Sequence, residues 1–482
     1  MAGNPPWVNW ENLPENYRDD TKPLWEEHGL FPHGGMDTIL GKGKKDISML
    51  MSYVAMDKYL KSGGKLGFLI TQSVFKTAGA GQGFRRFLLG TGEYVQVQHV
   101  DDMVELQPFE GASNRTSVVI LQKGRQTKYP MPSYLYWKKA VKGKSIAVDS
   151  SLDDVLQMTE RKQFAAEPVD EKDPTSAWLT GKPKAIKAVK KILGQSDYIA
   201  HAGCYTGGAN GVYWVDIIDK RPDGLVVVSN ITKGAKREVE NIQMAIEADL
   251  LYPLLRGRDV RRWYAEPSAH LLMVQDPDRR CGIDEDEMKT DYPKTYLYLK
   301  RFEPVLKQRK SRGVTDMIEG GAPFYTMFAV GDYTFAPYKV VWTRIAKIEA
   351  AVVNTLDGKY IIPQETITLV ACNSKEEAHY MAALVNSTTF QYAAISYSQA
   401  GGKSMGSMHV LENIRIPRFE PKNKLHQELS GLSQNAHYAV TIGDEAGLKE
   451  IIEPRIDELA AQVWGLSGEE FNDIRVSLEE MG

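Results

Sequence analysis

The stretch LKSGGKLGFLITQSVF, residues 60–75, decides how the N-terminal part of this chain folds. The residues before it, from Asp46 onward, carry apolar side chains at helical spacing, and Gly63 and Gly64 end that pattern. The apolar run from Leu66 to Ile70 that follows is typical of a buried strand. Together these residues predict an amphipathic helix that leads directly into a strand of a layered α/β sheet.

More elements of the same sheet follow along the chain. The run FRRFLL at residues 84–89 predicts a short helix, and YVQVQHVDD at 94–102 alternates apolar and polar residues as a half-buried strand does. The run RTSVVILQKG at 115–124 is a denser apolar strand. Because QPFEGASN at 107–114 joins the two strands, we expect a hairpin that closes one edge of the sheet. Residues 1–127 are therefore predicted to belong to an α/β domain.

Length and composition place the chain among ordinary globular proteins. Its residues are 43% hydrophobic and 25% charged, which are ordinary values for a soluble protein. A chain of 482 residues is too long for one hydrophobic core, so we expect two or three domains. The net charge of -3 gives no overall attraction for a polyanion, so nucleic-acid binding requires a local basic face. The three cysteines lie far apart and we find no apolar run long enough to span a bilayer, so we expect neither a disulfide framework nor a membrane protein.

The rest of the chain divides by composition. Residues 128–185 are rich in Pro, Lys and Asp with weak periodicity, and we expect a linker or peripheral excursion there. Residues 186–422 mix short strands, helices and loops, which indicates an α+β domain. Residues 423–482 are mostly amphipathic helix and are predicted to form a helical C-terminal segment.

The loop Asn4-Pro5-Pro6-Trp7 has the groups needed to bind a flat ring that carries an amino group. Consecutive prolines fix the backbone, so the Pro5 carbonyl and the Asn4 side-chain oxygen can both accept hydrogen bonds from that amino group. Trp7 can stack on a base that has been flipped out of its duplex. This chemistry is that of methyl transfer to an exocyclic amino group. The simpler alternative is that Pro-Pro-Trp forms a turn or a polyproline ligand.

The order of these motifs resembles that of a known enzyme family. GNPPW at 3–7, the helix from Asp46 with its GG strand, and PFEGASNRTSVVILQKG at 108–124 are similar to the motif series of the gamma-class amino-methyltransferases. These are the DNA adenine-N6 enzymes of TaqI-like and type IIG restriction-modification systems. The resemblance continues through LLRGRDVRRW at 254–263 and ENIRIPRFEP at 412–421, which look like parts of the target-recognition domain of these enzymes.

The resemblance implies a fold and roles for particular residues. It makes residues 1–127 the C-terminal part of a Rossmann-like methyltransferase sheet and residues 186–422 a DNA target-recognition domain. The residues from Asn4 to Trp7 are expected to be catalytic, and Phe109 falls where the family has a second aromatic residue against the flipped adenine. Without that role, Phe109 is a core residue of the hairpin. Asn4, Pro5 and Met51 fall near the position of the cofactor S-adenosylmethionine, although helical spacing equally makes Met51 a core residue.

One part of the family pattern is missing from the sequence. The family binds S-adenosylmethionine with a glycine-rich loop upstream of the Asn-Pro-Pro loop, and here only Met1, Ala2 and Gly3 precede it. We therefore expect an incomplete cofactor site, an unpaired sheet edge at Leu66 to Ile70, and a second chain that carries the N-terminal cofactor-binding half. TAGAGQG at 77–83 mimics a dinucleotide fingerprint, but it lies where the family has an ordinary loop and we interpret it as a turn.

Basic residues beside aromatic ones predict contacts with double-stranded DNA. In a recognition domain such clusters bind phosphates, whereas elsewhere they form solvated faces. The predicted DNA-binding residues are Lys233, Arg256, Arg258, Arg261, Arg262, Lys307, Arg309, Lys310 and Arg312. The nine histidines form no HxH or HxxxH pair, so no metal site is predicted.

Three functions remain open at this stage. The first is a DNA adenine-N6 methyltransferase fragment or subunit of a restriction-modification or phage-defence system in the prokaryotic cytoplasm, weak or inactive without its missing half. The second is a DNA-binding specificity subunit without catalytic function. The third is methyl transfer to a protein glutamine amide, since Asn-Pro-Pro-aromatic loops also occur in such enzymes. The basic and aromatic clusters downstream favour DNA.

Overall fold

The computed structural model describes residues 1–31, 45–106, 109, 115–141, 146–147, 149–344, 347–397 and 406–481, and the chain divides into two compact units. The first unit comprises Met1–Ile192, Tyr392–Gly402 and Gly465–Gly482, and the second comprises Leu193–Gln391 and Lys403–Trp464. Neither unit is one continuous stretch of sequence, because the chain passes from one to the other more than once. Among the described residues, no helix is both long and apolar enough to cross a membrane.

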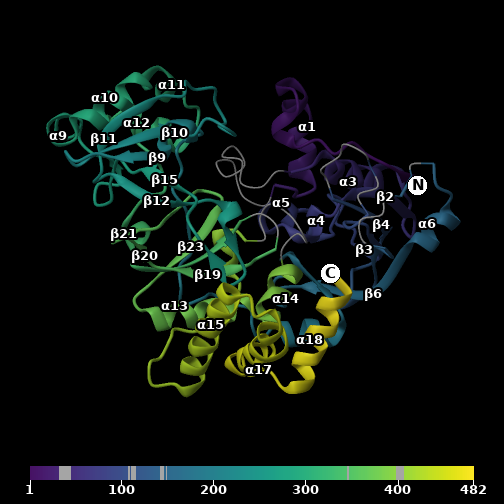
Figure 1. The fold of residues 1–482 in the computed structure, drawn as a ribbon. Helices are drawn as coiled ribbons and strands as arrows, with labels where there is room; N and C mark the ends of the chain where they lie inside the picture. Colours follow the sequence, from purple (N-terminus) through teal and green to yellow (C-terminus); the bar gives the residue numbers. More distant parts are fainter. Residues whose placement is uncertain are drawn as a thin grey trace. The chain divides into compact units, whose positions relative to one another are not determined.

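A seven-stranded mixed sheet forms the centre of the first unit (Figure 1). In spatial order its strands are β1 (Ala2–Gly3), β2 (Lys65–Thr71), β4 (Thr116–Lys123), β3 (Val95–Asp102), β5 (Met131–Lys139), β6 (Thr159–Pro168) and β7 (Trp178–Gly181). β2 pairs in parallel with β1 and antiparallel with β4. The expected unpaired edge at Leu66 to Ile70 is therefore wrong for Gly67 and Phe68, which pair with Ala2 and Gly3.

The elements around β2 form where the periodicity predicted them. Helix α3 (Ile47–Tyr59) begins at Asp46, whose carboxylate accepts the Ser48 N–H at 2.8 Å as an N-cap, and the helix packs against β2. The turn to β2 requires glycine at position 63, where φ is +81°. α3 is not amphipathic, however, because most of its residues are buried. The fold differs here from the sequence expectation only in how deeply the helix is enclosed.

The segment 128–185 is not the linker that its composition indicated. It contributes β5, β6 and β7 to the sheet, with β5 parallel to β3 and the two later strands antiparallel. Large side chains such as Tyr134, Phe164 and Trp178 are buried, while Glu160 and Arg161 at the start of β6 are exposed. The β3–β4 hairpin consequently lies inside the sheet and not at its edge. Its connecting residues 107–108 and 110–114 fall outside the described residues.

The second unit contains two larger sheets and several helices. The six-stranded sheet is ordered β11 (Gln243–Glu247), β10 (Leu225–Asn230), β9 (Trp214–Lys220), β15 (Ala269–Leu272), β12 (Leu251–Leu255) and β22 (Ile362–Pro363). The four-stranded sheet is ordered β19 (Ala350–Val353), β18 (Tyr338–Thr343), β23 (Ile367–Cys372) and β8 (His201–Ala202). Helices α13 (Lys375–Asn386), α15 (Lys424–Ile442) and α17 (Glu453–Val463) pack together in this unit. α18 (Gly468–Met481) packs on α7 (Pro183–Val189) in the first unit. The chain is a mixed α/β protein with several mixed sheets.

Candidate functional site

The loop from Asn4 to Trp7 follows β1 directly and is held at both ends by backbone hydrogen bonds. Before the loop, the Met1 carbonyl accepts the Gly67 N–H at 2.9 Å. After the loop, the Val8 carbonyl accepts the Ile47 N–H at 2.9 Å. Asn4 itself is exposed. The backbone is thus fixed to β2 and α3 while the Asn4 amide remains accessible to a ligand.

Trp7 is fixed by its own side chain. Its indole N–H donates to the Leu69 carbonyl of β2 at 3.2 Å. The centroid of its ring lies 5.2 Å from that of Phe109, and the two rings meet at 76° in an edge-to-face contact. Phe109 is 38% exposed, which excludes a place in the hairpin core. The structure thus brings together these two aromatic residues, one of which follows Asn4 by three residues.

A buried polar network anchors the segment that leads toward Phe109. Asp102, the last residue of β3, accepts hydrogen bonds from Gln72 Nε2 at 2.8 Å, from the Val104 N–H at 3.2 Å and from the Tyr134 hydroxyl. Burial raises the pKa of Asp102, and hydrogen bonds from Tyr134 and Gln72 oppose that shift. The network fixes the chain where it leaves the sheet.

Lys76, at the end of helix α4 (Ser73–Lys76), is a second buried polar group that the sequence did not indicate. Its ammonium donates to Thr180 Oγ1 at 2.5 Å and to the carbonyls of Trp178 and Ser396, both at 3.1 Å. Burial lowers the pKa of Lys76 to about 7, and the charge of Asp102 opposes this. Lys76 therefore ties α4 to β7 and to α14 (Thr388–Tyr397). A single lysine in VFK gives no sign in the sequence that it is enclosed.

Of the segments compared with a cofactor site in the sequence, Met51 is accessible to a ligand, whereas the glycine-rich segment 77–83 is not. Met51 is 40% exposed on α3, so it is not a core residue. The glycine-rich segment forms helix α5 (Ala78–Gln82), and other parts of the chain pack closely against its glycines. A Cβ at Gly83 would lie 2.7 Å from the backbone of Leu30, and one at Gly81 would lie 2.3 Å from the Val74 carbonyl. Glycine is needed at positions 81 and 83 because the backbone packs closely there, so we do not assign segment 77–83 to the binding of S-adenosylmethionine.

One group of described side chains has the residue types of a metal site. Atoms of Glu27, His28 and Asp57 lie within 4.8 Å of one another. However, His28 Nδ1 accepts the Gly90 N–H at 3.0 Å, whereas a metal-bound histidine normally donates from its second nitrogen. The Lys58 ammonium lies 3.2 Å from Glu27 and 3.1 Å from Asp57. The group is an ion-pair network of the fold.

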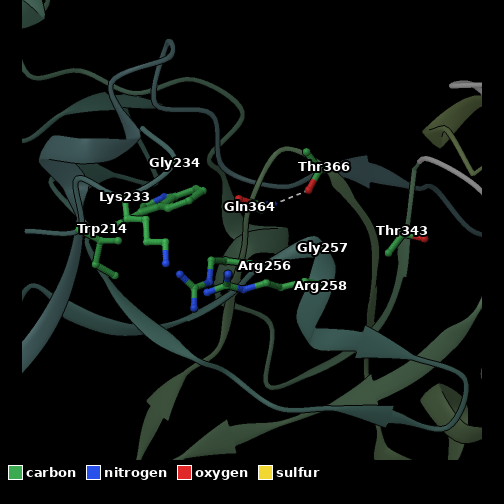
Figure 2. A pocket seen from close by; sticks show the side chains of 10 residues that line it. Trp214, Lys233, Gly234, Arg256, Gly257, Arg258, Thr343, Gln364 and Thr366 are labelled. Carbon is green, nitrogen blue, oxygen red and sulfur yellow. Dashed lines mark hydrogen bonds between the residues drawn. The ribbon is translucent and has the colours of Figure 1, made fainter. Parts of the chain in front are cut away.

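A cleft of about 780 Å³ in the second unit brings together cationic residues from separate elements. Its lining includes Lys233, Arg256 and Arg258 together with Trp214, Gln364 and Thr366. Figure 2 shows the amine of Lys233 pointing toward the guanidinium groups of the two arginines. Three of the predicted DNA-binding residues thus share one concave surface. The sequence indicated each basic cluster but not that the two meet.

Arg309 is not a surface residue, so its prediction as a phosphate contact is wrong. It is 2% exposed, and its guanidinium donates to the carbonyls of Thr206, Phe324 and Thr326. Five donors in a planar fork let one arginine bind several carbonyls, which is why arginine fits this position. The residue holds backbone segments of the second unit together.

The remaining predicted DNA-binding residues differ in their contacts. Arg262 binds Glu453 and lies over the Trp263 ring, so it is engaged within the second unit. Lys307 is exposed and pairs with Glu303 at 2.8 Å. Arg261, Lys310 and Arg312 are exposed. Exposed cations of this kind are available to a polyanion, whereas Arg262 is available only if its carboxylate partner is displaced.

The chain has measurable relatives among known proteins, although no protein-family model matches it. A stretch of 144 residues, 30% of this chain, is 28% identical to the type II methyltransferase M.NspV of Nostoc sp. (strain ATCC 29411 / PCC 7524), and it covers 28% of that protein. The fold is similar to that of the type IIL restriction-modification enzyme MmeI, solved in complex with DNA. The TM-score is 0.54 at 10% identity, over 100% of this chain and 56% of that one.

The type ISP restriction-modification enzyme LlaBIII, solved bound to DNA, is a more distant structural match. Its TM-score is 0.40 at 9% identity, over 91% of this chain and 29% of that one, which is too low to support any inference. The chain is therefore related to methyltransferases of restriction-modification systems through M.NspV, and its fold resembles that of MmeI. It spans about half the length of MmeI, and the match covers about a quarter of M.NspV.

Proposed function

We propose that this chain provides the base-binding and DNA-recognition parts of a DNA adenine-N6 methyltransferase of a restriction-modification or phage-defence system. Such an enzyme transfers a methyl group from S-adenosylmethionine to a flipped adenine. The observation that carries the proposal is the contact between Trp7 and Phe109, where Trp7 lies on the same sheet-anchored loop as the exposed Asn4. The relation to M.NspV, a type II methyltransferase, supports the same class of reaction.

In this proposal Asn4 and Pro5 orient the amino group that is methylated. The lone pair of N6 is delocalised into the adenine ring and is a poor nucleophile. When the Asn4 side-chain oxygen and the Pro5 carbonyl accept the two N–H groups, they favour a tetrahedral nitrogen whose lone pair is free to attack. N6 would bond to the methyl carbon as the bond from that carbon to the sulfur of S-adenosylmethionine breaks, and N6 would release one proton to solvent, so its charge is unchanged overall.

Trp7 and Phe109 are proposed to hold the base between them. Carbon atoms in van der Waals contact lie about 3.5 Å apart, so a base stacked between two aromatic planes needs a separation of about 7 Å. The present centroid distance of 5.2 Å and the edge-to-face angle leave no room for it. Trp7 is fixed by Leu69, so Phe109 is the residue that moves when a base enters.

Most of the S-adenosylmethionine site is proposed to come from a second chain. Among the described residues, only Asn4, Pro5 and the exposed Met51 lie at positions expected near that cofactor. The glycine-rich segment 77–83 is packed against its own chain and leaves no space for it. β1 is an edge strand whose two residues are exposed. An edge strand has free backbone groups that can pair with a further strand, so β1 is the proposed docking point.

The proposal is tested by adding a chain that carries a methyltransferase cofactor-binding half and measuring transfer of labelled methyl to DNA. We expect methylation in the mixture, and at least a hundredfold loss with Asn4→Ala, because one acceptor for the reacting amino group is removed. Asn9→Ala, the same change in the segment that follows the loop, is the matched control and should retain activity. Absence of methylation, or full activity of Asn4→Ala, contradicts the proposal. Label found on a protein glutamine would assign a different acceptor.

The basic cleft of the second unit favours a second candidate, a DNA-binding specificity subunit without catalysis. Such a subunit binds DNA with strong salt dependence, and Trp7→Ala leaves its biological effect unchanged. Gel-shift titrations at low and high salt test DNA binding, and the effect of Trp7→Ala distinguishes the two candidates. If Lys233→Ala lowers the slope of log affinity against log salt by about 0.9, the cleft contacts one phosphate through this residue. If the protein binds no DNA at all, both candidates fail.

A further inference from the structure

The cleft of the second unit contains a buried hydrogen-bond acceptor, Gln364 Oε1, to which a bound phosphate cannot donate. Gln364 is 8% exposed, and its Nε2 donates to Thr366 Oγ1. Its Oε1 is buried and has no hydrogen-bond partner among the residues that the structure describes. A buried carbonyl oxygen without a donor is destabilising, so its position in the wall of an open cleft points to a donor supplied by a ligand.

The cations of the cleft are arranged for an anion. Arg256 is held through Nε and Nη2 by Ser268, so its charge is fixed in the wall. The Asp259 carboxylate lies 3.6 Å from Arg256 and 3.8 Å from Arg258, so it offsets one of the three positive charges and leaves a net positive cluster. The Arg258 side chain is 70% exposed and Lys233 is exposed, and in Figure 2 the three cationic ends lie toward one another. The half-buried indole of Trp214 supplies an aromatic surface in the same cleft. Together these groups suit a ligand that is both anionic and flat.

The unpaired oxygen of Gln364 further restricts the chemical class of the ligand, because it requires a hydrogen-bond donor. A phosphate brings only acceptor oxygens, which a carbonyl repels, so phosphate alone leaves Gln364 unsatisfied. An amino group of a base supplies the missing donor. In duplex DNA the base edges lie at the floor of a major groove about 8.5 Å deep, and a side chain buried in a cleft cannot enter it. A base outside its stack can enter the cleft instead.

We infer that this cleft binds a single nucleotide with an amino-bearing base, either free or as an unstacked nucleotide of a DNA strand. The base lies against Trp214 and donates from its amino group to Gln364 Oε1. The 5′-phosphate binds Lys233, Arg256 and Arg258. A volume of about 780 Å³ accommodates such a ligand. This inference does not depend on methyl transfer, since binding involves only residues of the second unit.

Calorimetric titration of the full chain tests the inference with two probes, dAMP and deoxyribose 5-phosphate. We expect dAMP to bind at least tenfold more tightly, because only dAMP reaches Gln364 and Trp214. Gln364→Leu should remove that preference while binding of deoxyribose 5-phosphate persists. Lys233→Ala, at an exposed position that tolerates truncation, should weaken both probes about tenfold, the loss typical of one charge-assisted hydrogen bond. Arg221→Ala, an exposed arginine of the same unit, is the matched control and should change neither.

A duplex with one extrahelical adenine distinguishes the two sources of the nucleotide. If it binds more tightly than the fully paired duplex, and Gln364→Leu removes the gain, the cleft receives a nucleotide of DNA. If only dAMP shows the preference, the ligand is a free nucleotide. The inference is overturned if dAMP binds no more tightly than deoxyribose 5-phosphate and the extrahelical adenine gives no gain that Gln364→Leu removes. None of these measurements involves methylation, so their failure and that of the proposed function are separable.

Discussion

Lys76 makes the stability of the first unit depend on pH, and the size of the effect follows from its burial. Burial lowers the pKa of Lys76 from its usual 10.5 to about 7. Between these two values the folded protein keeps Lys76 neutral, whereas the unfolded chain binds a proton there. Because the unfolded state binds more protons in this window, the free energy of unfolding rises with pH. Below pH 7 both states are charged and the contribution is constant.

The substitution Lys76→Met isolates this contribution. Each pH unit between the two pKa values is worth about 1.4 kcal/mol, and allowing for partial titration near pH 7 gives about 2.5 kcal/mol between pH 7.5 and pH 9.5. Methionine has similar length and carries no proton. Groups that titrate elsewhere cancel when the two proteins are compared. The stability of wild type relative to the variant should therefore increase by about 2.5 kcal/mol over this interval, whatever the difference is at pH 7.5.

Urea denaturation at pH 7.5, 8.5 and 9.5, followed by circular dichroism, measures this difference. Lys22→Met, on the exposed side of α1 (Glu15–Glu27), controls for the loss of a lysine as such. Its difference from wild type should not follow the trend of Lys76→Met. A constant difference between wild type and Lys76→Met across the three pH values would refute the reasoning. It would mean that Lys76 keeps its proton in the folded protein, as it would if water reached its ammonium.

Three further substitutions test the contacts described above, each by chemical denaturation. Trp7→Phe keeps an aromatic ring but loses the N–H donated to Leu69, so we expect a loss of about 1 kcal/mol, and no loss would contradict the anchoring of the loop. Arg309→Met should cost about 3–5 kcal/mol because buried carbonyls lose their donor, whereas exposed Arg312→Ala should stay within about 0.5 kcal/mol, and similar values would argue against burial. Asp46→Ala removes an N-cap and should cost about 1 kcal/mol, most of which Asp46→Asn should restore; equal losses would show that charge and not capping is responsible.

The sequence predicted the elements whose pattern is local. Helix α3 and strand β2 follow from apolar spacing and from the glycines between them, which need no knowledge of the rest of the chain. Strands β5, β6 and β7 were missed because their polar residues dominate the composition of 128–185. Burial of Tyr134 and Trp178 arises only when these strands join the sheet. A composition average over such a segment hides the alternation that makes it a strand.

The sequence did not predict which basic residues are buried or which share a cleft, because both depend on contacts between residues far apart in the chain. Arg309 lies in the basic run KQRKSRG, and nothing in that run separates it from its exposed neighbours. Its burial results from carbonyls of residues 324 and 326 that fold back over it. In the same way, Lys233 and Arg256 belong to separate clusters in the sequence and share a cleft only in the folded unit. The nearness of Phe109 to Trp7 was expected only from the family resemblance.

The network at Asp102 connects the stability of the sheet with the candidate base site. Asp102 accepts three hydrogen bonds, and its burial raises its pKa. The hydrogen bonds from Tyr134 and Gln72 favour the ionised form of Asp102 and so oppose the effect of burial on its pKa. The third donor is the Val104 N–H, in the segment through which the chain continues toward Phe109. Loss of the Asp102 side chain therefore removes one anchor of the chain on the side of Phe109, while Trp7 stays bound to Leu69. One aromatic residue of the pair is thus bound directly to the sheet, whereas the other follows a segment that a buried polar network anchors.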